Sequence, residues 1–273
     1  MTQNVPAAPA LPPRSGTPPR LIGVVHLAPL PGSPRAADSL GEIIRRAVQD
    51  ARAYYEGGAD AVIVENFGDA PFFADRVEPH TIAAMTLAAR AVIAAVPLPV
   101  GINVLRNDAA AALGIAAMTG AAFIRVNIHT GVMVTDQGII EGRAAETLRY
   151  RRTLGAQVEI WADVLVKHGV PLGPQAIEDA ARDAVERGLA DAVIVTGSAT
   201  GLATDPTDVV RVRRVLPETP VYVGSGASPE TIPAFLPAAS GVIVGTWAKR
   251  DGEVHRPVDP ARVERLARAL RGT

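Results

Sequence analysis

The stretch GADAVIVEN (58–66) decides the fold class, because its pattern returns at LADAVIVTG (189–197) and more faintly at AASGVIVGT (238–246). Each copy leads from small residues through a short apolar run into polar residues at its end. The runs are continuous rather than alternating, which is typical of strands covered on both faces in a parallel sheet. The recurrence predicts a fold built from repeated strand–helix units.

Runs of this kind occur eight times, and Ala-rich segments separate them. The predicted strands are LIGVVH (21–26), DAVIVEN (60–66), VGINVL (100–105), FIRVN (123–127), VEIWADV (158–164), DAVIVTG (191–197), VYVGSG (221–226) and GVIVGT (241–246). Eight such units predict a single (β/α)8 TIM barrel. A doubly wound open sheet is the alternative, but no G-x-G-x-x-G motif follows the first strand to support it.

Local signals mark where helices begin. Ser39 and Glu42 have the spacing of a capping box, for a helix that ends near Gly57. Four prolines stand where a first helical residue is expected: Pro174, Pro206, Pro229 and Pro260. The segment 128–152 is too long for a turn, and its length is typical of a lid or an interface.

The chain divides into a tail and one domain. Residues 1–19 are rich in Pro and Ala, show no periodicity and lack the apolar core of a signal peptide, so we expect a disordered tail. Residues 20–273 form the predicted barrel, whose length suits the roughly 250 residues typical of this fold.

Composition excludes several classes of protein. The net charge is −1 and only 20% of residues are charged, which does not suit a protein that binds a nucleic-acid polymer. No run approaches the roughly 18 apolar residues of a membrane span. The absence of cysteine excludes disulfides and a cysteine nucleophile, and fits a cytoplasmic protein.

Ionisable residues gather where the predicted strands end, and in this fold the chemistry collects there. His26, Glu65 and Asp163 are the candidate catalytic residues for acid–base work. Glu65 and Asp163 could instead bind a divalent cation such as Mg²⁺, the one cofactor that the sequence suggests. A structural ion pair, for example with Arg125, is an equally good interpretation of each carboxylate.

Glycines and hydroxyls end the last three predicted strands. The candidate phosphate-binding residues are Gly197, Ser198, Gly224, Ser225, Gly226, Gly245 and Thr246. Glycine lets backbone N–H groups approach an anion, and phosphate commonly binds after strands seven and eight of this fold. The alternative for any one of these glycines is a plain tight turn.

Further polar residues at the same ends are candidates for substrate binding. They are Asn103, Asn107, Arg125, Asn127, Lys167 and His168. The alternatives are that the residues around Asn107 cap the following helix and that the charges on the loop after the fifth strand are solvated.

Several long motifs resemble the BtpA family, known for a member needed for photosystem I biogenesis. They are HLAPLPGSPR, DAVIVENFGDAPF, GINVLRNDAAAALGIA, FIRVN, TDQGIIEGRAAETLRYRRTLGA, ADVLVKH, VTGSATG, VGSG and VGTWAKRDG, and they span Leu21 to the C-terminus. The resemblance implies a barrel of the ribulose-phosphate-binding type. It supplies neither a reaction nor catalytic residues.

Two functions follow as alternatives. The first is an enzyme that acts on a phosphorylated small molecule by isomerase, epimerase or lyase chemistry. The second is a non-catalytic assembly factor, which should carry a contiguous apolar patch on an outer helix or in 128–152. Barrels of this type often self-associate, so a homo-oligomer is also expected.

Overall fold

Eight parallel strands close into a barrel in the computed structural model, which describes residues 18–197 and 204–272. The strands are β1 (Leu21–His26), β2 (Ala61–Glu65), β3 (Val100–Asn103), β4 (Phe123–Val126), β7 (Glu159–Val164), β9 (Ala192–Val195), β10 (Val221–Val223) and β11 (Gly241–Val244). Their order around the barrel is β1-β11-β10-β9-β7-β4-β3-β2. β1 pairs with both β2 and β11, so the sheet has no edge and the open-sheet alternative is wrong.

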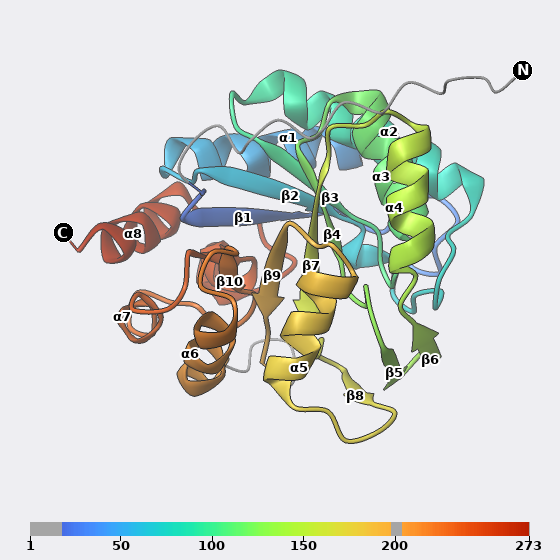
Figure 1. Cartoon of the computed structure of the whole chain (residues 1–273). Coiled ribbons are helices and arrows are strands. Elements are labelled where there is room, and N and C mark those ends of the chain that lie inside the picture. Colours follow the sequence, from blue (N-terminus) through green and yellow to red (C-terminus); the bar gives the residue numbers. More distant parts are fainter. Residues whose placement is uncertain (1–17, 198–203, 273) are drawn as a thin grey trace, which may run out of the picture.

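Helices surround the barrel (Figure 1). They are α1 (Leu40–Glu56), α2 (Pro79–Ala95), α3 (Ala109–Thr119), α4 (Ala144–Thr153), α5 (Ile177–Arg182), α6 (Pro206–Val215), α7 (Ile232–Phe235) and α8 (Pro260–Arg271). A π-helical turn, Asp183–Arg187, extends α5. α8 packs against α1, which brings the last helix back to the first. Within the described ranges, no helix has both the length and the apolar character needed to cross a membrane.

Aromatic rings fill the inside of the barrel. Phe123 stacks on Trp161 with ring centroids 3.8 Å apart, and Trp161 stacks on Tyr222 at 4.4 Å. Gly101 on β3 makes room for them, because a Cβ there would lie 2.2 Å from the Phe123 ring. Such a packed interior leaves the ends of the strands as the place where a ligand can bind.

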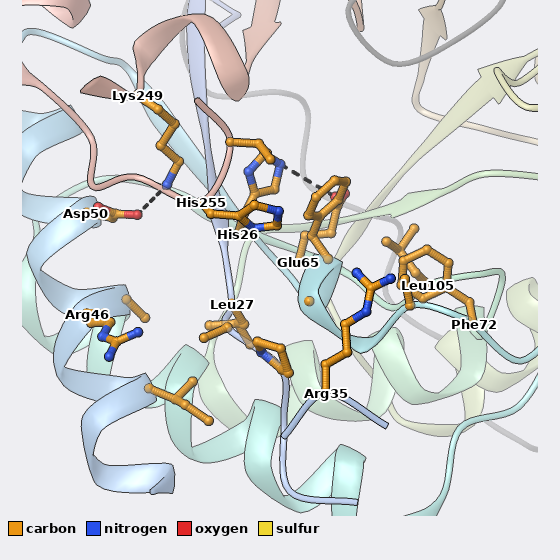
Figure 2. Close-up of a pocket in the computed structure, with 18 of the residues that line it drawn as sticks. His26, Leu27, Arg35, Arg46, Asp50, Glu65, Phe72, Leu105, Lys249 and His255 are labelled. Atoms are coloured by element: carbon orange, nitrogen blue, oxygen red, sulfur yellow. Dashed lines mark hydrogen bonds and ion pairs between the residues drawn. The ribbon is translucent and has the colours of Figure 1, made fainter. Parts of the chain in front are cut away.

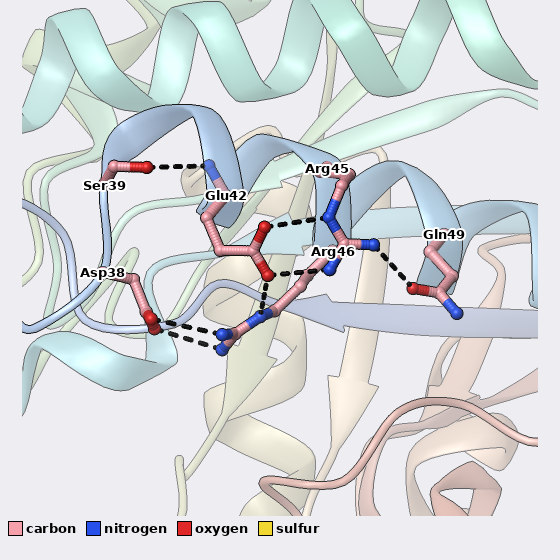
Figure 3. A network of polar contacts seen from close by, with 6 residues as sticks. All are labelled: Asp38, Ser39, Glu42, Arg45, Arg46 and Gln49. Carbon is pink, nitrogen blue, oxygen red and sulfur yellow. Dashed lines mark hydrogen bonds and ion pairs between the residues drawn. The ribbon is translucent and has the colours of Figure 1, made fainter.

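The start of α1 confirms the predicted cap. The Ser39 hydroxyl accepts a hydrogen bond from the Glu42 backbone N–H at 3.3 Å. The Glu42 carboxylate accepts hydrogen bonds from Arg45 and Arg46, and Arg46 also binds Asp38 (Figure 3). These hydrogen bonds lower the pKa of Glu42 to about 2.

Two of the four predicted helix starts are wrong. Pro206 and Pro260 do begin α6 and α8, each preceded by a capping aspartate. However, α5 begins at Ile177 rather than Pro174, because the backbone remains extended through Ala176 (ψ 144°). α7 begins at Ile232 rather than Pro229, because hydrogen bonds between Ser228 and Thr231 form a separate turn first.

The segment after β4 contains a small antiparallel sheet as well as α4. β5 (Val132–Thr135) pairs with β6 (Gly138–Glu141) and with β8 (Gly169–Pro171), which follows β7. Met133 and Ile140 are buried on its inner face. The outer face exposes an apolar stripe of Ile139, Val134 and Val170, which lie directly opposite one another in the register. The sheet therefore has the alternating pattern of a layer with one open face.

Candidate functional site

The last residues of β1 and β2 form the centre of the site. His26 and Glu65 are partners in the strand register, and His26 Nε2 lies 3.8 Å from Glu65 Oε1. The ring of Phe67, just after β2, lies against the His26 ring with centroids 4.5 Å apart. The His26 Nδ1 atom is buried and has no hydrogen-bond partner among the described residues. A histidine and a carboxyl group therefore face each other in a buried setting, with one ring nitrogen uncommitted.

Burial shifts the pKa values of these groups away from their usual range. The pKa of His26 is lowered well below its usual value, first by burial and then by the positive charge of Lys249 and Lys167. The pKa of Glu65 is raised by burial, although Arg125 and Lys167 act in the opposite direction. His26 is therefore held neutral, and Glu65 is shifted toward its protonated form. A neutral histidine beside a carboxyl group of raised pKa is an arrangement that suits acid–base catalysis.

Arg125 and Asp163 form a buried ion pair beside that centre. Arg125 donates two hydrogen bonds of 2.9 Å to Asp163, one to each carboxylate oxygen. Asn127 donates a third, also of 2.9 Å, and itself accepts one from Asn103. The predicted pairing of Arg125 is thus with Asp163 rather than Glu65. The Asp163 side chain is fully buried, so it acts on the site by holding Arg125 in place.

One cavity joins this centre to the glycine-rich strand ends. It has a volume of about 340 Å³ and lies at the carboxyl ends of β10 and β11; we call it the β11-side cavity. Nine predicted residues line it: His26, Glu65, Arg125, Lys167, Gly224, Ser225, Gly226, Gly245 and Thr246. Gly226 has φ +70°, and a Cβ on Gly245 would lie 2.6 Å from His26 Cε1. Glycine at 245 therefore lets the β11 loop approach the histidine.

A larger cavity of about 560 Å³ opens on the α1 side of the same centre (Figure 2). This α1-side cavity shares His26, Glu65, Phe67, Arg125 and Lys167 with the first. Its basic lining residues are Arg35, Arg46, Arg106, Arg125, Lys167, Lys249 and Arg256, and its acidic ones are Asp38, Asp50, Glu65 and Asp136. A chain of net charge −1 thus lines this cavity with an excess of positive charge, which favours an anionic ligand.

The remaining predicted residues lie at different distances from these cavities. Asn127 and His168 line the α1-side cavity. Among the described residues, Asn103, Asn107, Asp163 and Gly197 line neither of the two. Asn107 instead exchanges hydrogen bonds with the backbone of Ile128, and Asp108 caps α3 through Ala111 N–H. Ser198 lies outside the described residues.

The donor groups do not suit a metal ion. The described part of the chain contains no group of three or more His, Asp or Glu side chains that could hold one. Both carboxylate oxygens of Asp163 already accept hydrogen bonds from Arg125. Glu65 and Asp163 therefore do not fit the divalent cation that the sequence suggested for them.

The motifs along the chain belong to a known family, whose model matches residues 17–272. The chain belongs to the BtpA family. One BtpA-family relative, named photosystem I biogenesis protein BtpA, is from Synechocystis and is 51% identical over 250 residues, 92% of this chain and 87% of that protein. Another, an uncharacterised protein of Pyrococcus furiosus, is 48% identical over 248 residues, 91% of this chain and 93% of that protein.

Solved structures share the barrel of this BtpA-family chain at low sequence identity. Thiamine phosphate pyrophosphorylase of Pyrococcus furiosus has a TM-score of 0.58 and 11% identity, covering 93% of this chain and 96% of that one. N-(5'-phosphoribosyl)anthranilate isomerase of the same organism has a TM-score of 0.56 and 17% identity, covering 93% and 99%. These likenesses confirm the expected fold, and at such identities they show the fold alone.

Sequence reasoning missed several residues of the site. Phe67 follows β2, Arg46 and Asp50 lie within α1, and Lys249 and His255 follow β11. Asp50 and Lys249 are 199 positions apart and form a buried ion pair. Asp50 lies within a helix and Lys249 lies three residues beyond the predicted strand GVIVGT (241–246), so neither carries a local signal of this contact. Only barrel closure brings them together.

Proposed function

We propose that this BtpA-family protein is an enzyme that acts on a phosphorylated small molecule by acid–base chemistry of the isomerase, epimerase or lyase type. One observation carries the proposal: a single cavity joins the glycine and hydroxyl groups after β10 and β11 to His26 and Glu65. A phosphate bound at one end would place the rest of the ligand against the ionisable pair at the other.

The β10 and β11 ends have the chemistry of a phosphate site. The backbone around Gly226 and Gly245 can bring N–H groups close to an anion, and Ser225 and Thr246 add hydroxyl donors. Phosphate is commonly bound at these two strand ends in (β/α)8 barrels. The names of the two structural neighbours include phosphorylated compounds, which supports the proposal by analogy of fold.

We assign the proton transfers to Glu65 and His26. Glu65, with its raised pKa, donates a proton, and neutral His26 accepts one. Arg125, held by Asp163, stabilises negative charge that develops on a substrate oxygen. In this proposal Asp163 is a positioning residue, and His26 and Glu65 are the catalytic ones.

Thr246→Val tests the phosphate site. The substitution removes a hydroxyl at nearly constant volume. Thr86→Val is the matched control, since within the described part of the chain the Thr86 hydroxyl donates only to the Ile82 carbonyl of its own helix. Calorimetry with inorganic phosphate and with phosphorylated and unphosphorylated sugars should give about 5- to 100-fold weaker binding of the phosphorylated compounds by Thr246→Val, as for loss of a charge-assisted hydrogen bond. Equal binding by both variants would contradict the phosphate assignment.

Glu65→Gln tests the chemistry. On any phosphorylated compound that the protein turns over, we expect kcat to fall by about 10²- to 10⁴-fold, the usual contribution of a general acid or base. Phosphate binding should be kept, because the amide preserves the shape of the side chain. Full activity of this variant would exclude Glu65 from the reaction.

A second candidate function is that of a non-catalytic assembly factor, as the name of the Synechocystis relative says of that protein. The exposed stripe of Ile139, Val134 and Val170 favours it, since Val134 and Ile139 lie in 128–152, one of the places where an assembly factor should carry an apolar patch. Its partner would be an apolar surface of the complex being assembled.

Complementation separates the two functions. In a Synechocystis strain that lacks its relative, photosystem I content would be measured with Glu65→Gln and with Ile139→Lys. Enzymatic action predicts that Glu65→Gln fails and Ile139→Lys succeeds, whereas docking through the stripe predicts the reverse.

The cytoplasmic location and the homo-oligomer expected from the sequence stay predictions. Size-exclusion chromatography with light scattering tests the oligomeric state.

A further inference from the structure

Lysine occurs at only two positions in this chain. Lysine and arginine together number 27, yet every one of them except Lys167 and Lys249 is arginine. Both lysines line the α1-side cavity. Arginine stays protonated at physiological pH, so it cannot serve as an amine nucleophile. The chain thus has its only amino side chains in the α1-side cavity, which shares His26 and Glu65 with the cavity of the proposed function.

Lys249 is committed to the structure. Its side chain is 2% exposed, and Nζ donates to one carboxylate oxygen of Asp50 (Figure 2). The other oxygen of Asp50 accepts the backbone N–H of Val258 at 2.8 Å. The Lys249 amine is therefore committed to a buried ion pair, and breaking such a pair would leave Asp50 buried without its partner.

Lys167 is placed differently. It lines both cavities, beside His26, Glu65 and Arg125. Within residues 18–197 and 204–272, its Nζ has no hydrogen bond and no ion pair. Burial and the neighbouring charge of Arg125 lower the pKa of this amine. Its neutral, nucleophilic form is therefore more accessible than that of an ordinary lysine.

The backbone around Lys167 is fixed and locally strained. Its N–H donates to the Thr196 hydroxyl at 3.0 Å, and its carbonyl accepts from the Arg106 guanidinium. Leu165 has φ +48° and His168 has φ +60°, so residues with a side chain occupy the left-handed region on both sides of the lysine. Such conformations are sparsely populated and cluster at active sites, where they fix the direction of a side chain.

We propose that Lys167 is a catalytic nucleophile that forms a Schiff base with the carbonyl carbon of a phosphorylated aldehyde or ketone. This inference rests on the proposed function, from which it takes the phosphate anchor. It adds the reacting group of the substrate and the covalent intermediate.

The neighbouring groups complete the reaction. The neutral Nζ adds to the carbonyl carbon, and the proton that it loses passes to the carbonyl oxygen, giving a carbinolamine. Glu65 then protonates that hydroxyl, which leaves as water while the C=N bond forms with a positive charge on nitrogen. The cationic imine withdraws an electron pair from a bond at the adjacent carbon, and neutral His26 accepts the proton released there. His26 then returns a proton to a carbon of the resulting enamine, and water hydrolyses the cationic imine so formed. This step releases the carbonyl product, returns the neutral amine of Lys167 and gives a proton back to Glu65.

Borohydride trapping tests the proposal on the whole chain. The protein would be incubated with dihydroxyacetone phosphate or with unphosphorylated dihydroxyacetone, reduced with sodium borohydride and analysed by intact mass and peptide mapping. We expect one reduced adduct, at Lys167. Lys249 is the internal control within the same molecule, and the labelling rate should favour Lys167 by about tenfold for each unit by which its pKa lies below that of an ordinary lysine.

Two variants keep the test independent of a folding defect. Lys167→Arg retains the charge of the side chain, and Lys167→Met retains about its length. Both variants should lose the adduct while showing the circular dichroism of the parent protein. No adduct in the parent protein, or equal labelling of Lys167, Lys249 and the N-terminus, would overturn the proposal.

The comparison of the two probes separates this proposal from the one on which it rests. If both hold, dihydroxyacetone phosphate labels Lys167 faster than dihydroxyacetone, and inorganic phosphate slows only the former. If only the lysine assignment holds, both probes label Lys167 at equal rates and phosphate has no effect. If only the proposed function holds, phosphate binds and Glu65→Gln abolishes turnover, but no adduct forms.

Discussion

His26 and Glu65 are predictable as neighbours, because the register of parallel strands places both at the same rim of a barrel. Their altered protonation is not predictable from the local sequence. The pKa of His26 falls because of burial and because Lys249, Lys167 and Arg125 approach it from later parts of the chain. The sequence thus predicts the residue types at the rim, and closure of the barrel determines their electrostatics.

His26→Gln should change how stability depends on pH. Because the folded protein lowers the pKa of His26, the unfolded chain binds the proton more readily as the pH falls below about 6.5. The histidine therefore costs stability on acidification, by up to about 1.4 kcal/mol per pH unit for one proton. The free energy of unfolding, measured with urea between about pH 7 and about pH 5, should fall less steeply on acidification for His26→Gln than for the parent protein.

His129→Gln is the matched control for that prediction. His129 is also buried, its Nε2 lies 2.8 Å from the Gly188 carbonyl oxygen, and burial lowers its pKa. Its replacement should also make the free energy of unfolding fall less steeply on acidification. Phosphate binding should stay unchanged, because His129 lines neither cavity. An unaltered slope in His26→Gln would contradict the direction of the His26 shift.

At the scale of elements, the barrel strands are where continuous apolar runs predict them, whereas the connections differ. The run VMVTDQGIIE (132–141) forms the β5–β6 hairpin, with Met133 and Ile140 buried and Val134 and Ile139 exposed. The third strand of this sheet, β8, comes from after β7. α5 and α7 begin three residues later than their prolines suggest. The proline signals fail here because the backbone stays extended through Ala176 before α5, and because Ser228 and Thr231 form a separate turn before α7.

Gly245→Ala tests the close approach of the loop after β11 to His26 on β1. The new Cβ would lie 2.6 Å from His26 Cε1, so the ring must move. We expect a loss of about 1–3 kcal/mol in the free energy of unfolding, the usual cost of overpacking. Phosphate binding, measured by calorimetry, should weaken in parallel. Unchanged stability and binding would mean that His26 has room to turn away.

Gly41→Ala is the control for a glycine that nothing crowds. Among the described residues, a Cβ there would meet only the Ser39 hydroxyl, at 4.0 Å, on the first turn of α1. Alanine in a helix should raise the free energy of unfolding by about 0.5–1 kcal/mol. The two substitutions are chemically identical, so opposite signs would isolate the contact with His26.

At the scale of the whole molecule, the aromatic stack of Phe123, Trp161 and Tyr222 connects β4, β7 and β10 across the barrel interior. Trp161→Ala should therefore cost about 3–5 kcal/mol, as for truncation of a large core side chain. Trp247→Phe is the control, since Trp247 is only half-buried, with its ring against Arg262 and Arg265, and phenylalanine retains an aromatic ring there. The chain has two tryptophans, so fluorescence of the control variant reports on Trp161 alone. The unfolding transition followed by this fluorescence should coincide with the loss of helical circular dichroism if the closed sheet unfolds as one unit. Separate transitions, or a cost below about 1 kcal/mol for Trp161→Ala, would show that the interior does not hold the barrel together.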